Sequence, residues 1–374
     1  MTRWKTYRLG DIIDKVIDNR GKSAPTSDEK YSPIIEINSI GDRNPNYDVV
    51  RKWVSKDTYD TWFRSGHPMI GDILIPTVGT IGIVSMMREN KGCIAQNIVA
   101  LRTNEKAHNL YLYYFLKSGY AKQELLNLNI GGVQPSIKVP HLLNLEISLP
   151  PLQEQRRIAG ILSAIDDKIE NNRRINDNLE QQAQALYKQW FVDNRNEDWE
   201  TLTLDDVATI SAGGDKPQIC SEKKTSECNI PIYSNGIDNE GLYGYTNNPR
   251  IIENSVTISA RGTIGFVCLR TEPYVPIVRL ISVIPTYDNM SAYFLYLWAL
   301  TQNISGTGTT QQQLTVPAFR TTQIVVPSQE ILIRFNNVVK PIFDCIKQNK
   351  VENETLATLR DTLLPKLMNG EIKL

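Results

Sequence analysis

Residue types that usually build catalytic and metal sites are scarce in this chain of 374 residues. The sequence has three histidines and five cysteines, without a Cys-x-x-Cys pair or a Cys/His cluster at the spacing of zinc ligands. These residues are His67, His108, His141, Cys93, Cys220, Cys228, Cys268 and Cys345. We therefore expect reduced, mostly structural cysteines, structural or exposed histidines, and no metal or cofactor site.

Long apolar segments and the usual catalytic motifs are also missing. No apolar run approaches the roughly 20 residues of a membrane span, and the first residues lack the apolar stretch of a signal peptide, so we expect a cytoplasmic protein without a membrane partner. There is no Gly-x-Ser-x-Gly elbow. The run from Arg20 to Ser23 resembles a phosphate loop, but Val16 stands where a Walker A motif needs glycine. The Asn-Pro-Pro-aromatic tetrapeptide of adenine methyltransferases is absent, and we expect no catalytic residue.

The charges of the chain balance, with 41 basic and 41 acidic side chains. Residues 1–150 hold 19 basic against 15 acidic groups, whereas residues 199–327 hold 8 against 11. Because nucleic-acid phosphates are bound by Lys and Arg, the second half cannot be a general electrostatic surface for them. Any binding of nucleic acid must use local basic loops, or another subunit must supply phosphate contacts.

The most informative feature of the sequence is an internal repeat. Residues 4–12 return as residues 199–207, and the Gly-Thr-Ile-Gly run at 79–82 returns at 262–265. Three more ordered matches complete the repeat: residues 111–116 with 293–298, 139–140 with 316–317, and 149–150 with 326–327. The offset falls stepwise from 195 to 177, as small deletions in the second copy would produce.

Each copy begins with a globular part and ends with a helical part. The globular parts contain short β-type runs separated by Gly, Asn and Pro, with one helical patch near residues 109–118 or 289–301. This pattern indicates an α+β or mainly β globule, and we predict the α+β class. We predict two similar globular domains joined by two long antiparallel helices. The segments, in chain order, are residues 1–150, 151–198, 199–327 and 328–374.

Apolar residues of both helical segments recur in heptads. The first seam comprises Ile158, Ile165, Asn172, Leu179 and Leu186, with Leu162, Ile169, Asn176, Ala183 and Trp190. The second comprises Phe335, Ile342, Asn349, Leu356 and Leu363, with Leu332, Val339, Ile346 and Asn353. Arg360 occupies the next seam position, and Pro341 falls inside the pattern, where we expect it to kink the helix or delay its start.

Four asparagines lie near the middle of the two helical segments. Asn172 and Asn176 correspond to Asn349 and Asn353 in the repeat. In an antiparallel pair the four amides would share one layer and fix the register, because sliding by one turn would leave amides facing leucine. The alternative is that these asparagines face solvent and the helices pack elsewhere.

Two segments carry a resemblance to a known family. Residues 149–158, Leu-Pro-Pro-Leu-Gln-Glu-Gln-Arg-Arg-Ile, with the heptad helix after them, closely resemble the first conserved region of type I restriction-modification specificity subunits. Residues 359–372 resemble the second conserved region. The Gly-Thr-Ile-Gly run with Gln96, and the Gly-Val-Gln-Pro run before the helix, are similar to the family's target-recognition domains. The second copy departs from the pattern at Ser328, where the first copy has Pro151.

The resemblance implies a non-catalytic subunit that joins two methyltransferase subunits, and often two restriction-translocase subunits, on double-stranded DNA. Each recognition domain would read one half of a split asymmetric site, with helices of about 60 Å setting the gap. S-adenosylmethionine, ATP and Mg²⁺ would be bound by the partner subunits. We assign partner contacts to the start of the first helix and the end of the second: Pro150, Pro151, Glu154, Gln155, Leu364 and Pro365.

Side chains that can bond to bases or phosphates mark candidate DNA contacts in both domains. Arg20 and Lys22 lie in a basic loop whose counterpart contains Lys216, and Arg261 precedes the second Gly-Thr-Ile-Gly run. The full predicted set is Arg20, Lys22, Arg43, Thr80, Gln96, Gln134, Lys216, Arg261, Arg279, Gln311, Gln312 and Gln313. Ordinary surface turns and polar helix caps remain alternatives for these loops. Tyr111, Tyr113 and Tyr114 are predicted to be core residues rather than stacking platforms for bases.

Two other interpretations remain open from the sequence. The same fold could serve as a stand-alone DNA-binding or scaffold module without enzyme partners, which neighbouring genes would reveal. An enzyme with its own nuclease or methylase is the second interpretation, and the absence of motifs argues against it.

Overall fold

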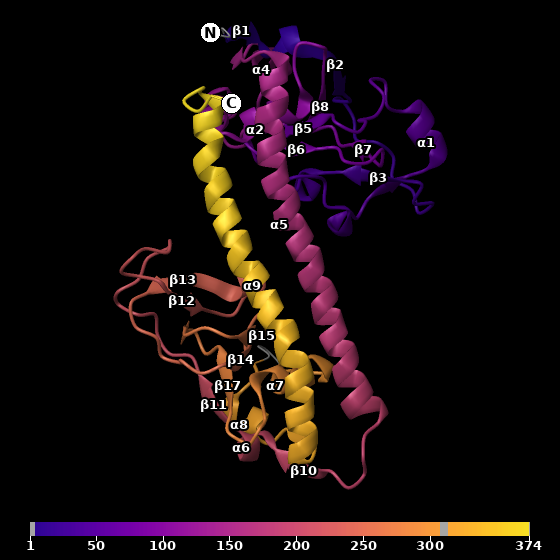
Figure 1. The fold of residues 1–374 in the computed structure, drawn as a ribbon. Helices are drawn as coiled ribbons and strands as arrows, with labels where there is room; N and C mark the ends of the chain where they lie inside the picture. Colours follow the sequence, from indigo (N-terminus) through magenta and orange to yellow (C-terminus); the bar gives the residue numbers. More distant parts are fainter. Residues whose placement is uncertain (1–3, 307–312, 374) are drawn as a thin grey trace. The chain divides into compact units, whose positions relative to one another are not determined.

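The computed structural model describes residues 4–306 and 313–373, and the chain divides into two compact units (Figure 1). The first unit is formed by the residues up to Asn171 together with those from Glu352 onward, and the second by Asn172–Val351. Each unit contains one globular domain and a part of each long helix. Within the described residues, no helix combines the length and the apolar character that a membrane span requires.

The described residues of the first unit form three small sheets. Their strand orders are β1-β9, β2-β8-β5-β6 and β4-β3-β7, and the only parallel pair among the described residues of this unit is β3 with β7. The strands are β1 (Lys5–Arg8), β2 (Ile13–Asp18), β3 (Ser32–Ile35), β4 (Trp53–Val54), β5 (Ile73–Pro76), β6 (Ser85–Met86), β7 (Cys93–Ile94), β8 (Ile98–Thr103) and β9 (Glu146–Leu149). The shorter helices are η1 (Leu9–Ile12), η2 (Ile37–Ser39), η3 (Tyr47–Val49), α1 (Lys56–Thr61), α2 (Asn109–Lys117), α3 (Gly119–Asn127) and α4 (Val139–Leu143).

The second unit repeats this topology strand for strand. Its sheets have the orders β10-β18, β11-β17-β14-β15 and β13-β12-β16, and β12 with β16 is again parallel. The strands are β10 (Glu200–Thr203), β11 (Ala208–Ala212), β12 (Ile230–Tyr233), β13 (Leu242–Thr246), β14 (Ser255–Ile258), β15 (Val267–Arg270), β16 (Val275–Pro276), β17 (Ile281–Pro285) and β18 (Gln323–Val326). The shorter helices are α6 (Leu204–Val207), η5 (Asp238–Gly241), α7 (Ala292–Thr301) and α8 (Val316–Arg320). The predicted α+β fold and internal repeat are confirmed.

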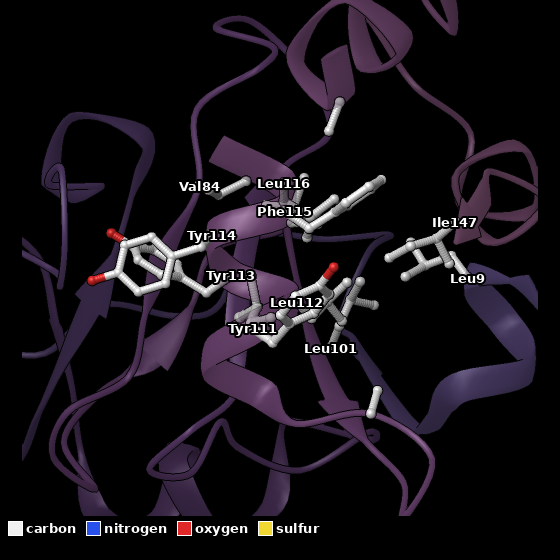
Figure 2. Close-up of a cluster of buried hydrophobic side chains, with 14 of the residues drawn as sticks. Leu9, Val84, Leu101, Tyr111, Leu112, Tyr113, Tyr114, Phe115, Leu116 and Ile147 are labelled. Atoms are coloured by element: carbon white, nitrogen blue, oxygen red, sulfur yellow. The ribbon is translucent and has the colours of Figure 1, made fainter. Parts of the chain in front are cut away.

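The helical patch that interrupts the strands in each copy forms the centre of the core. In the first unit α2 is buried from Tyr111 to Leu116, and Figure 2 shows these side chains among Leu9, Leu101 and Ile147. Helix α7 is buried from Ala292 to Ala299 in the same way. The prediction that the three tyrosines of α2 are core residues is therefore confirmed.

Two long helices follow the globular domains, as the heptads predict. They are α5 (Leu152–Tyr187), which continues into a π-helical turn, η4 (Lys188–Asp193), and α9 (Gln329–Met368). None of the predicted seam positions is exposed. Ser328 does not shift the start of the helix. Helix α5 begins two residues after Pro150, and α9 begins two residues after the equivalent Pro327. The expectation that Pro341 delays the helix is wrong: Pro341 and Asn337 are both exposed, so water can satisfy the carbonyl that proline leaves without a donor.

The long helices pair in antiparallel fashion, and contacts inside each unit show it. In the first unit Asp166 bonds to Arg360 at 2.8 Å, and Lys168, further along α5, bonds to Glu352 at 3.2 Å, further back along α9. In the second unit the Asn349 amide donates to Asn176 Oδ1 at 2.8 Å. The antiparallel arrangement is therefore confirmed.

Only part of the predicted asparagine layer can be described inside one unit. Asn176 and Asn349 are hydrogen-bonded to each other, and Asn172 is almost fully buried, with 1% of its surface exposed. Asn172 and Asn353 belong to different units. The role of the four residues in fixing the helix register stays a prediction.

Candidate nucleic-acid interface

Most candidate residues of the first unit lie at one edge of its four-stranded sheet. Because β8 is antiparallel to both β2 and β5, the carboxyl ends of β2 and β5 lie beside the amino end of β8. We call the loops at this place the loop edge. They carry Arg20 and Lys22 after β2, Gln96 before β8, and Thr80 after β5, and all four side chains are exposed.

Gln134 joins this edge through backbone contacts. The Gly79 N–H donates to the Pro135 carbonyl at 2.9 Å, and Val78 forms an isolated bridge with Ser136. Gly79 has a φ of +87°, a left-handed conformation that glycine adopts without strain. The Gly-Thr-Ile-Gly turn and the glutamine loop, separate in sequence, therefore lie side by side, with Gln134 exposed next to the turn.

The second unit has an equivalent loop edge. Lys216 follows β11, Arg279 precedes β17, and Arg261 follows β14, and all three are exposed. The Arg261 guanidinium donates to Gln313 Oε1 from Nε at 3.2 Å and from Nη2 at 3.0 Å. This pair joins the second Gly-Thr-Ile-Gly turn to its glutamine loop, and it orients a guanidinium whose planar fork matches guanine or phosphate.

Other charged and aromatic groups shape these edges. Lys216 Nζ lies 5.1 Å from the centroid of the Tyr243 ring, and the exposed Lys216 side chain has its pKa raised by hydrogen bonding to Tyr243 and Cys220. The Arg20 side chain bonds to Asp18 at 2.6 Å. Since Asp18 competes for the guanidinium, Arg20 would have to leave this carboxylate to contact a phosphate through the same nitrogen.

Arg43 lies elsewhere in the first unit. It lies beside β6, where its carbonyl accepts the Met86 N–H at 3.0 Å, and its side chain forms an ion pair with Asp167 on α5. Burial alone would lower the pKa of Arg43, but the hydrogen bond to Asp167 raises it overall. The geometry thus gives Arg43 a packing role between the domain and α5, and its contact with DNA stays a prediction. Gln311 and Gln312 lie outside the described residues.

Three of the predicted partner contacts lie in the interior of the first unit. Gln155 is 1% exposed, and its amide accepts from His108 N–H at 2.8 Å and donates to the Pro150 carbonyl at 2.9 Å. Pro150 and Leu364 are buried as well. The Gln155 amide and the Leu364 side chain thus hold the helix ends against the domain, and the partner contacts of these three residues stay predictions. Pro151 and Glu154 are half-buried and Pro365 is exposed, so these remain predictions.

The histidines have structural surroundings. His67 stacks on Tyr59 with ring centroids 3.6 Å apart, and its Nε2 lies 2.8 Å from the Tyr59 carbonyl. Burial lowers the pKa of both His67 and His108. In the part of the chain that the structure describes, no three His, Cys, Asp or Glu side chains gather as a metal site would need.

Two residues of the second loop edge were missed by the sequence analysis. Asn235 donates to the Val278 carbonyl and accepts from the Ala260 N–H, both at 2.7 Å. Val278 itself has a left-handed φ of +53°. Asn235 is distant in sequence from both residues that it contacts. Only a prediction of the strand order could therefore have brought these residues together.

Comparison with known proteins gives matches over most of the chain. A family model described as a type I restriction modification DNA specificity domain matches residues 1–181 and 196–357. The MjaIX specificity subunit of a type I restriction enzyme from Methanocaldococcus jannaschii is 28% identical over 351 residues, covering 81% of this chain and 78% of that protein. A putative type I specificity subunit from Mycoplasma pneumoniae is 27% identical, covering 87% and 85%.

A solved structure shares the fold. The S subunit of a type I restriction-modification system from M. genitalium aligns over 98% of this chain and 96% of its own, with a TM-score of 0.62 and 18% sequence identity. At that identity the likeness concerns the fold, two α+β domains that are each followed by a long helix.

Proposed function

We propose that this chain selects a split, asymmetric sequence on double-stranded DNA. The premise is that the chain belongs to the family of type I restriction-modification DNA specificity subunits. Each globular domain would read one half of the site through its loop edge, and the helices α5 and α9 would set the gap. The observation that carries the proposal is the repeated gathering of arginine, lysine and glutamine side chains at equivalent sheet edges of two domains with one topology.

The chemistry of the two loop edges supports recognition of bases. Glutamine can bond to adenine with both amide groups, and arginine can bond to guanine with two nitrogens. The first edge offers Gln96 and Gln134, and the second offers Arg261 and Arg279. Because the second globular domain has more acidic than basic groups, oriented donors rather than net charge would give it affinity for DNA.

The proposal leaves catalysis to other subunits. The chain would join two methyltransferase subunits, and in a complete system two restriction-translocase subunits, which would bind S-adenosylmethionine, ATP and Mg²⁺. Pro151, Glu154 and Pro365 are the candidate partner contacts at the helix ends that are not buried. Incubation of the pure chain with DNA, Mg²⁺ and S-adenosylmethionine should leave the DNA unmethylated, and addition of the methyltransferase subunit should produce methylation.

A hybrid protein tests the recognition proposal. In the hybrid, residues 1–150 are replaced by the equivalent segment of another family member. The hybrid and the unmodified chain are each used to select duplexes from a pool of random sequence. The hybrid should change one half of the enriched site and keep the other half and the gap.

The matched control is the reciprocal hybrid, in which residues 199–327 are exchanged instead. It should change the other half of the site. Enrichment of no sequence by the unmodified chain, or a change of both halves in each hybrid, would contradict the proposal.

A further inference from the structure

The strand pairing aligns the two loop edges residue by residue. In the first unit the Ala95 N–H donates to the Ile35 carbonyl at 3.0 Å, and in the second the Ile277 N–H donates to the Tyr233 carbonyl at 2.9 Å. Both bonds lie at the parallel strand pair of their unit. With the registers of the four-stranded sheets, this gives the following pairs: Ile37 with Asn235, Thr77 with Ala260, Gln96 with Val278, and Asn97 with Arg279.

In the first unit a main-chain carbonyl closes the edge. The Thr77 N–H donates to the Asn97 carbonyl at 2.8 Å, and neither Gln96 nor Asn97 has a positive φ. Ile37, at the position of Asn235, packs an apolar side chain toward the turn, since a Cβ on Gly79 would lie 3.2 Å from its Cδ1. No side-chain amide is needed here.

The second unit closes its edge differently. Val278 and Arg279 both adopt left-handed φ values, +53° and +62°, which are strained for residues other than glycine and most of all for a β-branched valine. Their N–H groups donate to the carbonyls of Gly214 and Gly213, both at 2.9 Å. The Ala260 N–H donates to the Asn235 side chain instead of to the turn.

One amide therefore satisfies two backbone groups. Ala260 is 1% exposed, so its N–H would lie away from water without the Asn235 oxygen. The Asn235 nitrogen bonds to the Val278 carbonyl, which the left-handed turn directs toward it. Strained turns persist only where their surroundings hold them, and such turns concentrate at functional sites.

We propose that Asn235 is a positioning residue that holds the Val278–Arg279 turn in its left-handed conformation and so fixes Arg279 beside Arg261 for DNA recognition. The inference rests on the proposed function. Asn235 contacts the residues adjacent to both arginines, Ala260 before Arg261 and Val278 before Arg279. A turn that is ordered before binding loses less entropy when its arginine meets a base, which favours affinity and selectivity.

Amide hydrogen exchange tests the clamp without DNA. Asn235→Ala removes both hydrogen bonds and should speed exchange at Ala260 about tenfold or more. Asn235→Asp keeps an acceptor for Ala260 but loses the donor to Val278, so exchange at Ala260 should stay slow. Asn229→Ala, an exposed asparagine at the opposite end of β12, is the matched control and should leave exchange at Ala260 unchanged.

DNA binding tests the function of the clamp. The probe is a labelled duplex that the unmodified full chain enriches from a random pool. Asn235→Ala and Arg279→Ala should each weaken binding about tenfold, and the double variant should bind no more weakly than Arg279→Ala alone. Adding Val278→Gly to Asn235→Ala should recover much of the loss, since glycine adopts the left-handed turn without strain.

The outcomes separate this inference from the proposed function. Slow exchange at Ala260 in Asn235→Ala, or an equal further loss of affinity when Asn235→Ala is added to Arg279→Ala, would overturn the positioning role. If the unmodified chain enriches no sequence, the proposed function fails, while the exchange measurement still decides whether Asn235 holds the turn.

Discussion

Replacing Arg360 with methionine tests what holds the end of α9 to the first unit. Asp166, 6% exposed, accepts a hydrogen bond from Arg360 at 2.8 Å and another from the Tyr114 hydroxyl at 2.7 Å. Burial and the nearby Asp166 carboxylate raise the pKa of Tyr114 far above its usual value, so the hydroxyl stays protonated and donates. Arg360→Met leaves a buried carboxylate with one side-chain donor from this cluster.

The size of the effect follows from this burial. Breaking a buried ion pair by removing one partner costs about 3–5 kcal/mol. The Arg360 side chain is 19% exposed and also pairs with the exposed Asp361, which favours the lower limit, about 3 kcal/mol. Tyr114→Phe removes one hydrogen bond to a charged group and should cost about 2 kcal/mol. A triple variant with Tyr114→Phe, Asp166→Leu and Arg360→Met removes every polar member and should return to within about 1 kcal/mol of the unmodified chain.

Hydrogen exchange measured by mass spectrometry can assign the loss to one unit. A loss of 3 kcal/mol corresponds to roughly 150-fold faster exchange in peptides of α2 that open with the first unit. Peptides of α7 in the second unit are the internal control and should be unaffected. The reasoning is refuted if Arg360→Met leaves α2 unchanged, or if the triple variant is as unstable as Arg360→Met.

Three further predictions concern the helices and pH. Asn349→Leu should lower the stability of the second unit to urea by about 1 kcal/mol, whereas Asn176→Leu with Asn349→Leu should restore or raise it, since neither member of the hydrogen-bonded pair is then left facing leucine; equal losses would be contrary evidence. The pKa of His67 lies below its ordinary 6.5, so the unfolded chain binds the proton first and stability should fall as pH drops below 6.5. His67→Phe should flatten this fall in urea unfolding, and an unchanged slope would contradict it. One heptad inserted after Leu179 and one after Leu356 should lengthen the preferred gap between half-sites by about three base pairs in a selection over varied spacers; an unchanged gap at full affinity would exclude the helices as its determinant.

The features that the sequence predicted well are those with a period or a repeat. The heptads located both long helices, and the repeated Gly-Thr-Ile-Gly run aligned two domains whose strands follow the same order. These patterns are local in the chain, or are copied from one half to the other, so no knowledge of distant contacts is needed to find them.

The features that the sequence could not predict depend on which distant groups meet. Arg43 looks like a loop arginine until Asp167 on α5 is found beside it. Gln155 looks like a surface residue at the start of a helix, but its side-chain amide accepts a hydrogen bond from the His108 N–H and donates one to the Pro150 carbonyl. The effect of Pro341 on its helix also depends on tertiary surroundings, because it is set by whether the Asn337 carbonyl, which proline leaves without a donor, faces water.

The two loop edges show how one topology can present different chemistry. Both place a turn between a parallel strand and the central strand of the larger sheet, yet one turn is closed by a main-chain carbonyl and the other by the amide of Asn235. The second solution places Arg279 in a left-handed turn, and the amide that holds this turn also bonds to the residue before Arg261. If these edges read DNA, the half with Gln96 and Gln134 should favour adenine and the half with two arginines should favour guanine. Since the strands beneath are equivalent, such a difference would arise from the side chains and the conformation of the turn, not from the fold.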